Sequence, residues 1–254
     1  MKREYCIIDP AGNVTALVTT PAEHKDYKSV AARIMSGNPQ VEQVGFVEFG
    51  ENGARLNMSG DEFCGNAVMC AAALYCSVKG GEKGVIPVTV LPFGKTLNVT
   101  VCSKAGDFIC ECEFSKPQTV SDCSFFASER EYRFPLVCFD GIMHVVADNT
   151  LSEAAAKKVI IQLAKRLKAQ ALGIMLYDPA DKSLLPVVYV PALNTLVLER
   201  SCASGSCAVA AVLPEFENAV QIAEPGGVIT ARRTKEGIYL KTRLKITKKL
   251  AEEI

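Results

Sequence analysis

The spacing of apolar residues predicts two amphipathic helices, over Lys25–Ser36 and Glu153–Lys168. In each segment, apolar side chains recur three or four positions apart, and lysines and arginines fall between them. The apolar faces consist of Val30, Ala31, Ile34 and Met35 in the first helix and of Val159, Ile160, Leu163, Ala164 and Leu167 in the second. The pattern Thr150-x-x-Glu153 is typical of a capping box at the start of the second helix.

Two other tracts are apolar on every side. Both are rich in Ala and Val and almost without charge; one ends near Leu74 and the other near Val212. A helix with no polar face is expected to be buried all round. A cysteine opens each tract, Cys64 in the first and Cys202 in the second, and each is followed by a short stretch of small or polar residues.

Strands flank these buried helices in a repeated order. A hairpin pattern precedes each helix, and a strand–turn–strand pattern follows each one. The preceding strands are Val44–Phe49 with Ala54–Met58 in the first case and Leu172–Tyr177 with Leu184–Tyr189 in the second. The repeat predicts an internal duplication, because Cys64 and Cys202 are separated by a little over half the chain.

We therefore predict an α+β fold of two pseudo-symmetric halves. Each half is expected to be a curved mixed sheet wrapped round one buried central helix. The halves are placed at residues 1–125, which carry Cys64, and 126–254, which carry Cys202. The polar stretch Gln118–Pro135, where periodicity is weak, is predicted to be the hinge between them.

Composition narrows the class of protein. The 254 residues are 49% hydrophobic, which is globular rather than disordered composition. Lys and Arg together number 28, as do Asp and Glu together, so the formal net charge is zero. The chain therefore has no net positive charge with which to hold nucleic acid. No apolar run approaches membrane-spanning length, and the first residues have no signal-peptide hydrophobic region, so we expect that the chain is not exported. We expect a cytoplasmic homodimer that binds a small molecule, with neither nucleic acid nor membrane as a partner.

The eleven cysteines are expected to be thiols, because a chain that is not exported meets a reducing environment. Their spacing does not favour a metal site: CxxC is absent, and only two histidines accompany them. The pair Cys110-x-Cys112 lies in an alternating pattern that is typical of a half-buried strand. Most of the others, Cys102 and Cys123 among them, are interpreted as small core residues.

Cys64 and Cys202 differ from the rest because each lies at a helix N-terminus. Free N–H groups there stabilise a thiolate and can also bind a carboxylate. Two such sites suggest a cleft of near-twofold symmetry, in which a thiol faces each side of a substrate α-carbon. One thiolate would remove the α-proton while the other thiol donates a proton from the opposite side. This chemistry inverts a stereocentre with no cofactor, and the sequence contains no phosphate-binding loop that would imply pyridoxal phosphate.

The motifs together resemble the cofactor-independent amino-acid racemases of the diaminopimelate epimerase superfamily. The similar segments, in chain order, are Ile8-Asp-Pro-Ala-Gly-Asn13, Phe63-Cys-Gly-Asn-Ala67, Met143-His-Val-Val146, Cys202-Ala-Ser-Gly-Ser206 and Glu224-Pro-Gly-Gly227. The resemblance implies that Cys64 and Cys202 are catalytic. The residues expected to bind substrate are Asn13, Gln43, Gly65, Asn66, His144, Glu199, Ala203 and Ser204.

The substrate is less clearly indicated than the reaction. Diaminopimelate epimerases hold a second carboxylate with an arginine well before the second cysteine, whereas Arg200 here lies only two positions before Cys202. Segments such as Glu42–Phe46 and Met58–Ala67 are similar to the histidine racemases of staphylopine-type metallophore synthesis. Histidine is therefore the first expected substrate, with ornithine, lysine and diaminopimelate as alternatives. Two other classes stay open: a fold relative that isomerises with other groups, and a non-enzymatic thiol protein.

Overall fold

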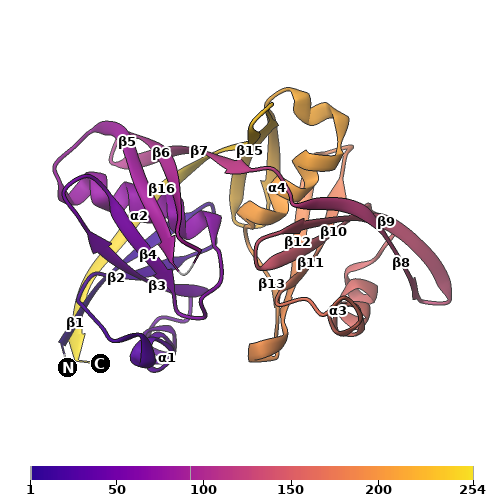
Figure 1. The fold of residues 1–254 in the computed structure, drawn as a ribbon, viewed down its shortest axis with the longest axis horizontal. Helices are drawn as coiled ribbons and strands as arrows, with labels where there is room; N and C mark the ends of the chain where they lie inside the picture. The colour runs from indigo at the N-terminus through magenta and orange to yellow at the C-terminus, as the bar shows by residue number, and fades with distance from the viewer. Residues whose placement is uncertain (1, 92, 254) are drawn as a thin grey trace. The chain divides into compact units, whose positions relative to one another are not determined.

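A computed structural model describes residues 2–91 and 93–253, which form two compact units (Figure 1). Unit 1 comprises Met1–Glu113 together with Lys241–Ile254, and unit 2 comprises Phe114–Leu240. The expected halves placed one boundary after residue 125; the C-terminal segment instead returns to unit 1, because its strand pairs with the first strand of the chain. Met1, Pro92 and Ile254, which those halves include, lie outside the described residues.

Unit 1 is a mixed sheet closed on itself around a helix. Its strands are β1 (Lys2–Pro10), β2 (Thr15–Val18), β3 (Gln43–Phe49), β4 (Ala54–Met58), β5 (Lys83–Leu91), β6 (Lys95–Lys104), β7 (Asp107–Ser115) and β16 (Gly237–Glu253), of which β7 and β16 continue into unit 2. They follow one another in that order, and pairing of β1 with β16 closes the ring. The helices are η1 (His24–Asp26), α1 (Tyr27–Gly37) and α2 (Gly65–Val78).

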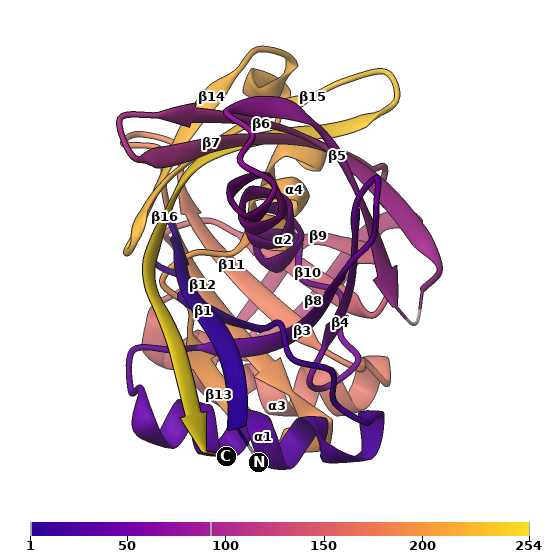
Figure 2. The same ribbon diagram turned by 90° about the vertical axis from the view of Figure 1, so that its left-hand side faces the viewer.

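Helix α2 lies inside this barrel. Figure 2 shows it encircled by the strands of unit 1, and it packs against β1 to β6. Every residue from Gly65 to Cys76 is buried, as its uniformly apolar sequence predicts. Helix α1 packs on β3 through Val30, Ala31 and Ile34.

Unit 2 is a second curved mixed sheet around a helix. Its strands are β8 (Thr119–Ala127), β9 (Arg130–Phe139), β10 (Ile142–Ala147), β11 (Leu172–Asp178), β12 (Ser183–Val190), β13 (Thr195–Leu198), β14 (Val220–Glu224) and β15 (Gly227–Arg233). The order is β15-β14-β12-β11-β10-β9-β8, with β13 beside β12. Its helices are α3 (Glu153–Leu167), η2 (Pro191–Leu193), α4 (Ala203–Val212) and η3 (Pro214–Glu217). The buried α4 packs on β9, β10, β11 and β15, and the amphipathic α3 covers β8, β11 and β12.

The two units have the same order of strand pairings. In unit 1, β2 pairs parallel with β3, β3 antiparallel with β4, and β4 parallel with β5. In unit 2 the same sequence of pairings joins β10, β11, β12 and β14. The amphipathic helix precedes the second of these strands in both units, and the buried helix follows the third. The two cysteines therefore occupy equivalent places in the two topologies.

Three local predictions were wrong. The predicted hinge is the β8–β9 hairpin, in which alternate residues such as Cys123 and Phe125 are buried and the polar residues between them face outward. The start of α3 is capped by Ser152, whose Oγ accepts a hydrogen bond from Ala155 N at 3.2 Å, and not by Thr150. Met35 is 38% exposed because it lies at the edge of the apolar face of α1.

The cysteines occupy several environments. All eleven are free thiols, and most are buried, including the strand residues Cys110 and Cys112. Cys102, expected in the core, is exposed because it falls on the outward-facing side of β6. Among the helices of the described residues, none is both long and apolar enough to span a bilayer.

Candidate active site

Cys64 is the N-cap of α2. Its backbone is extended (φ −131°, ψ 110°), and its Sγ accepts a hydrogen bond from Ala67 N at 3.4 Å. Serine, threonine, aspartate or asparagine normally fills this position with an oxygen. The cysteine places a sulfur beside the first N–H groups of the helix, which have no partner within the helix itself; a thiolate is stabilised at this positive end.

Three polar residues from separate segments of unit 1 meet around Cys64. Gln43 Nε2, at the start of β3, lies 3.0 Å from Cys64 Sγ and also contacts the side chains of Asn13 and Thr15. Asn66, the second residue of α2, donates from Nδ2 to Asn13 Oδ1 at 3.2 Å. The predicted residues Asn13, Gln43, Cys64, Gly65 and Asn66 thus form one cluster, and Asn13 and Asn66 are buried.

Cys202 occupies the matching position in unit 2. It is the N-cap of α4 (φ −135°, ψ 101°), and its Sγ accepts from Gly205 N at 3.3 Å. Ser204, the second residue of the helix, lies with its Oγ 3.5 Å from that sulfur and 2.9 Å from His144 Nε2. The His144–Ser204 contact in unit 2 therefore corresponds to the Asn13–Asn66 contact in unit 1.

His144 is fully buried on β10, and burial lowers the pKa of its imidazole to about 3. Its Nδ1 has no hydrogen-bond partner among the described residues. Gly173, its neighbour on β11, leaves room for the ring: a Cβ at that position would lie 2.3 Å from Nδ1. His144 is therefore a neutral group that orients Ser204 rather than a proton carrier near neutral pH.

We expect acid to destabilise the fold through His144. The unfolded chain protonates this side chain below its ordinary pKa of about 6.5, whereas the folded protein does not until about pH 3. The free energy of unfolding should fall across that range, by about 2 kcal/mol between pH 7 and pH 5. Denaturant titrations of the parent and of His144→Gln at both pH values measure the difference. An equal loss in the two proteins would contradict the assignment.

Two carboxyl groups accompany Cys202. Glu199, which follows β13, is hydrogen-bonded to the Cys202 side chain, and Glu224, at the end of β14, accepts from Cys202 N at 2.6 Å. Burial raises the pKa of the Cys202 thiol well above its ordinary value, and the two carboxyl groups raise it further. The cluster in unit 2 thus brings together the predicted residues His144, Glu199, Cys202, Ala203 and Ser204.

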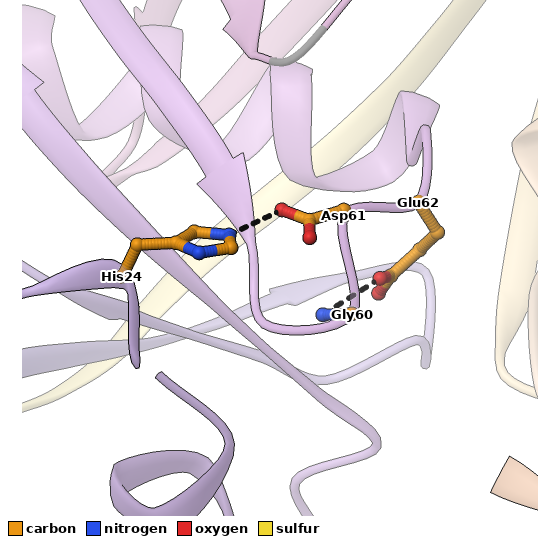
Figure 3. A network of polar contacts seen from close by, with 4 residues as sticks. All are labelled: His24, Gly60, Asp61 and Glu62. Carbon is orange, nitrogen blue, oxygen red and sulfur yellow. Dashed lines mark hydrogen bonds and ion pairs between the residues drawn. The ribbon is translucent and has the colours of Figure 1, made fainter. Parts of the chain in front are cut away.

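The turn before Cys64 carries an acidic residue with a different role. Glu62 Oε2 accepts from Gly60 N at 3.0 Å, and the neighbouring Asp61 contacts His24 Nε2 at 2.8 Å (Figure 3). Glu62 therefore closes the turn between β4 and α2, whereas the thiol of Cys64 caps the helix itself. His24 and Asp61 are substantially exposed, so their ion pair contributes little to stability.

Sequence reasoning missed three residues of these clusters. Thr15 contacts Gln43 at 2.9 Å, and Glu42 Oε2 accepts from Asn13 Nδ2 at 2.8 Å. Glu224 holds the start of α4 from a distant strand. The sequence showed Glu224 as part of the Glu-Pro-Gly-Gly segment, but its contact with α4 is visible only in the hydrogen bonds of the folded chain. The described part of the chain contains no group of three or more His, Cys, Asp or Glu side chains that could hold a metal ion.

Comparison with known proteins identifies a family. Residues 2–250 match the model described as "Histidine racemase CntK N-terminal domain". A histidine racemase from Fusobacterium nucleatum is 29% identical over 236 residues, which cover 88% of this chain and 87% of that protein.

Solved structures agree on the fold. A predicted epimerase from Pseudomonas aeruginosa aligns over 99% of both chains with a TM-score of 0.74 at 12% identity. A probable proline racemase from Agrobacterium radiobacter, solved with bound carbonate, has a TM-score of 0.71 at 12% identity, over 99% of this chain and 92% of that one. The mixed sheet with few helices is therefore an arrangement shared with proteins named as racemases and epimerases.

Proposed function

Because the chain belongs to the histidine racemase family matched over residues 2–250, we propose that it inverts the α-carbon of histidine with Cys64 and Cys202 as the two acid–base groups. The protein is an isomerase of the racemase and epimerase class. The observation that carries the proposal is the matched pair of cysteines: each caps a buried helix, and each sulfur accepts a hydrogen bond from the N–H three residues further on.

The two thiols have the chemistry that α-proton transfer needs. A thiolate can remove the α-proton of an amino acid, and a thiol on the opposite face can return one, so the stereocentre inverts in one passage. The proton taken by one sulfur and the proton given by the other balance, and no oxidant or reductant is required. The N–H groups at the starts of α2 and α4 are available to stabilise the charge that develops on the substrate carboxylate.

The polar neighbours of the cysteines supply roles for substrate binding. We assign the α-carboxylate to backbone N–H groups around Gly65–Asn66 and Ala203–Ser204. The α-ammonium group needs acceptors, and we assign this role to Glu199 and to Asn13, whose Oδ1 would exchange a hydrogen bond from Gln43 or Asn66 for one from the substrate. The common arrangement of two duplicated units, each with a helix-capping cysteine, also leads us to interpret the fold as a variant of the diaminopimelate epimerase type.

The described charges favour a substrate with one carboxylate. A second carboxylate in a closed site would need an arginine or equivalent donors, because an unpaired buried charge costs several kcal/mol. Arg200 is exposed, and its backbone carbonyl accepts from Gly226 N, which holds this part of the chain in place. Neither side-chain cluster includes an arginine among the contacts described above. Histidine, with one carboxylate and a neutral polar side chain, fits this charge pattern.

We expect L-histidine to be the preferred substrate in a panel with L-ornithine, L-lysine and LL-diaminopimelate. The measurement is kcat/KM for each amino acid, read by chiral chromatography. Preference for diaminopimelate by tenfold or more, about 1.4 kcal/mol of transition-state stabilisation, would contradict the charge argument.

Glu199→Gln should lower kcat/KM more than Glu62→Gln, because Glu199 contacts the Cys202 thiol whereas Glu62 closes an exposed turn. We expect a loss of about tenfold or more for the first, since a hydrogen bond to a charged group contributes about 1.5–3 kcal/mol. Glu62→Gln is the matched control. Equal losses in the two variants would remove Glu199 from the proposed site.

A further inference from the structure

Glu224 is a buried carboxyl group that is bonded to the first turn of α4 through both of its oxygens. Its Oε2 accepts from Cys202 N at 2.6 Å, and its Oε1 accepts from Ser206 Oγ at 2.6 Å. The side chain is only 7% exposed, and Ser206 is fully buried. Among the described residues, the ion pairs of unit 2 do not include Glu224. A carboxyl group placed in this way holds the backbone of Cys202 and also places a titratable charge beside its thiol.

We propose that Glu224 is a positioning residue for Cys202: its two hydrogen bonds fix the start of α4, and its negative charge, when present, keeps the Cys202 thiol protonated. In unit 1, Cys64 Sγ contacts the Gln43 amide at 3.0 Å and the Ala67 N–H at 3.4 Å. The Cys202 thiol, in the equivalent position of unit 2, lies beside the carboxyl groups of Glu199 and Glu224.

The other titratable groups near Cys202 do not change this picture. Glu199 adds a second negative charge on the same thiol, and His144 is held neutral by burial. Cys207 is buried in α4, and Arg233 on β15 is directed to Ala211 O at the opposite end of the helix. Burial raises the pKa of Glu224 to about 8, so its charge appears only as the pH rises through that value.

The consequence for turnover rests on the proposed function. When Cys202 gives its proton to the α-carbon, the S–H bond breaks, its electron pair stays on sulfur, and a C–H bond forms. Cys202 is then a thiolate until it takes a proton from water or from a substrate α-carbon. A protonated Glu224 tolerates that thiolate, whereas an ionised Glu224 opposes it, since two like charges in a buried site repel strongly.

The test measures thiol reactivity and does not require turnover. The full-length protein and its Glu224→Gln variant are treated with methyl methanethiosulfonate from pH 6.5 to 9.5, and modification of each cysteine is followed by mass spectrometry. Glutamine keeps the shape and cannot ionise: its amide oxygen can accept from Cys202 N, and its Nε2 can donate to Ser206 Oγ, which reverses that hydrogen bond. Below the thiol's pKa, the reaction rate follows the thiolate fraction, so a charge effect is visible as a rate ratio. Glu236→Gln, at an exposed hairpin position of the same unit, is the matched control.

At Cys202, the rate in Glu224→Gln divided by the rate in the parent should be close to one at pH 6.5 and threefold or more at pH 9.5. The same ratio at Cys64 should stay near one, as should every ratio for Glu236→Gln. A ratio at Cys202 that does not change with pH would overturn the proposal, because mere loosening of α4 raises reactivity at every pH.

A second variant keeps the test decisive if Glu224→Gln does not fold. Ser206→Ala removes a hydrogen bond that lowers the pKa of Glu224, so the bend that Glu224 ionisation produces in the Cys202 rate profile should move to higher pH. An unmoved bend would contradict the proposal. Labelling does not depend on substrate, so the two proposals can fail separately. If the protein racemised no amino acid but showed the predicted ratios, the proposed function would be wrong and the effect of Glu224 on Cys202 would stand.

Discussion

Cys64→Ser and Cys202→Ser should each lower kcat/KM for histidine racemisation by about 10³-fold or more. A serine hydroxyl is a far weaker acid than a thiol, and a positioned acid–base group contributes about 10²- to 10⁴-fold to the rate. Both variants should keep the fold, because serine is itself a favoured N-cap that can accept from Ala67 N or Gly205 N.

Cys70→Ser is the control for loss of a thiol that does not react. Cys70 is fully buried inside α2, and burial raises the pKa of its thiol well above the ordinary value. This variant should lose stability, because a hydroxyl replaces an apolar group, but should keep its activity per folded molecule. More than one tenth of the parent activity in either Cys64→Ser or Cys202→Ser would contradict the assignment of both cysteines as catalytic.

Gly173→Ala should impair both stability and turnover. The new Cβ would lie 2.3 Å from His144 Nδ1 and 2.6 Å from Met175 Cε, so the ring and the thioether must both move. Such overpacking costs about 1–3 kcal/mol of unfolding free energy. Displacing His144 also releases Ser204, which contacts the Cys202 sulfur, and a misplacement of this kind can cost about 10²-fold in rate.

Gly84→Ala in β5 is the matched control, because a Cβ there would meet only Ile86 Cδ1 at an ordinary 3.6 Å. Thermal unfolding and kcat should both be measured for the two variants. If Gly173→Ala matched Gly84→Ala in both quantities, His144 would not be held by the close contact with β11.

The elements that carry periodic patterns were predictable from sequence. The uniformly apolar tracts are the buried helices α2 and α4, and the cysteines before them are N-caps, as expected. The shared order of strands and helices in the two units was predictable, because the pattern of apolar residues indicates each element in turn. The N-terminal chemistry of a helix depends on residues adjacent in sequence, so it needs no knowledge of tertiary contacts.

Contacts between distant segments were less predictable. Strands β8 and β9 form a hairpin whose polar residues lie on one exposed side. Serines and acidic residues interrupt the alternation of apolar and polar positions there, so the pattern does not predict a strand. The segment 245–254 carried no recognisable pattern, yet Lys245–Glu253 pairs with β1. Its lysines Lys245, Lys248 and Lys249 are exposed, and a strand with one face in solvent can carry such residues. The hydrogen bond between Glu224 and Cys202 joins residues that are far apart in the sequence, and no local pattern predicts such a contact.

The most direct test of two-thiol racemisation is the position of deuterium at early times in heavy water. L-histidine is incubated with the enzyme, and the α-hydrogen content of recovered L-histidine and of D-histidine is measured separately before equilibrium. Two thiols on opposite faces predict that D-histidine carries deuterium from the first turnover while recovered L-histidine keeps its original proton. Equal deuterium in substrate and product from the earliest time would indicate a single base that serves both faces, and would contradict the assignment of Cys64 and Cys202 as a pair.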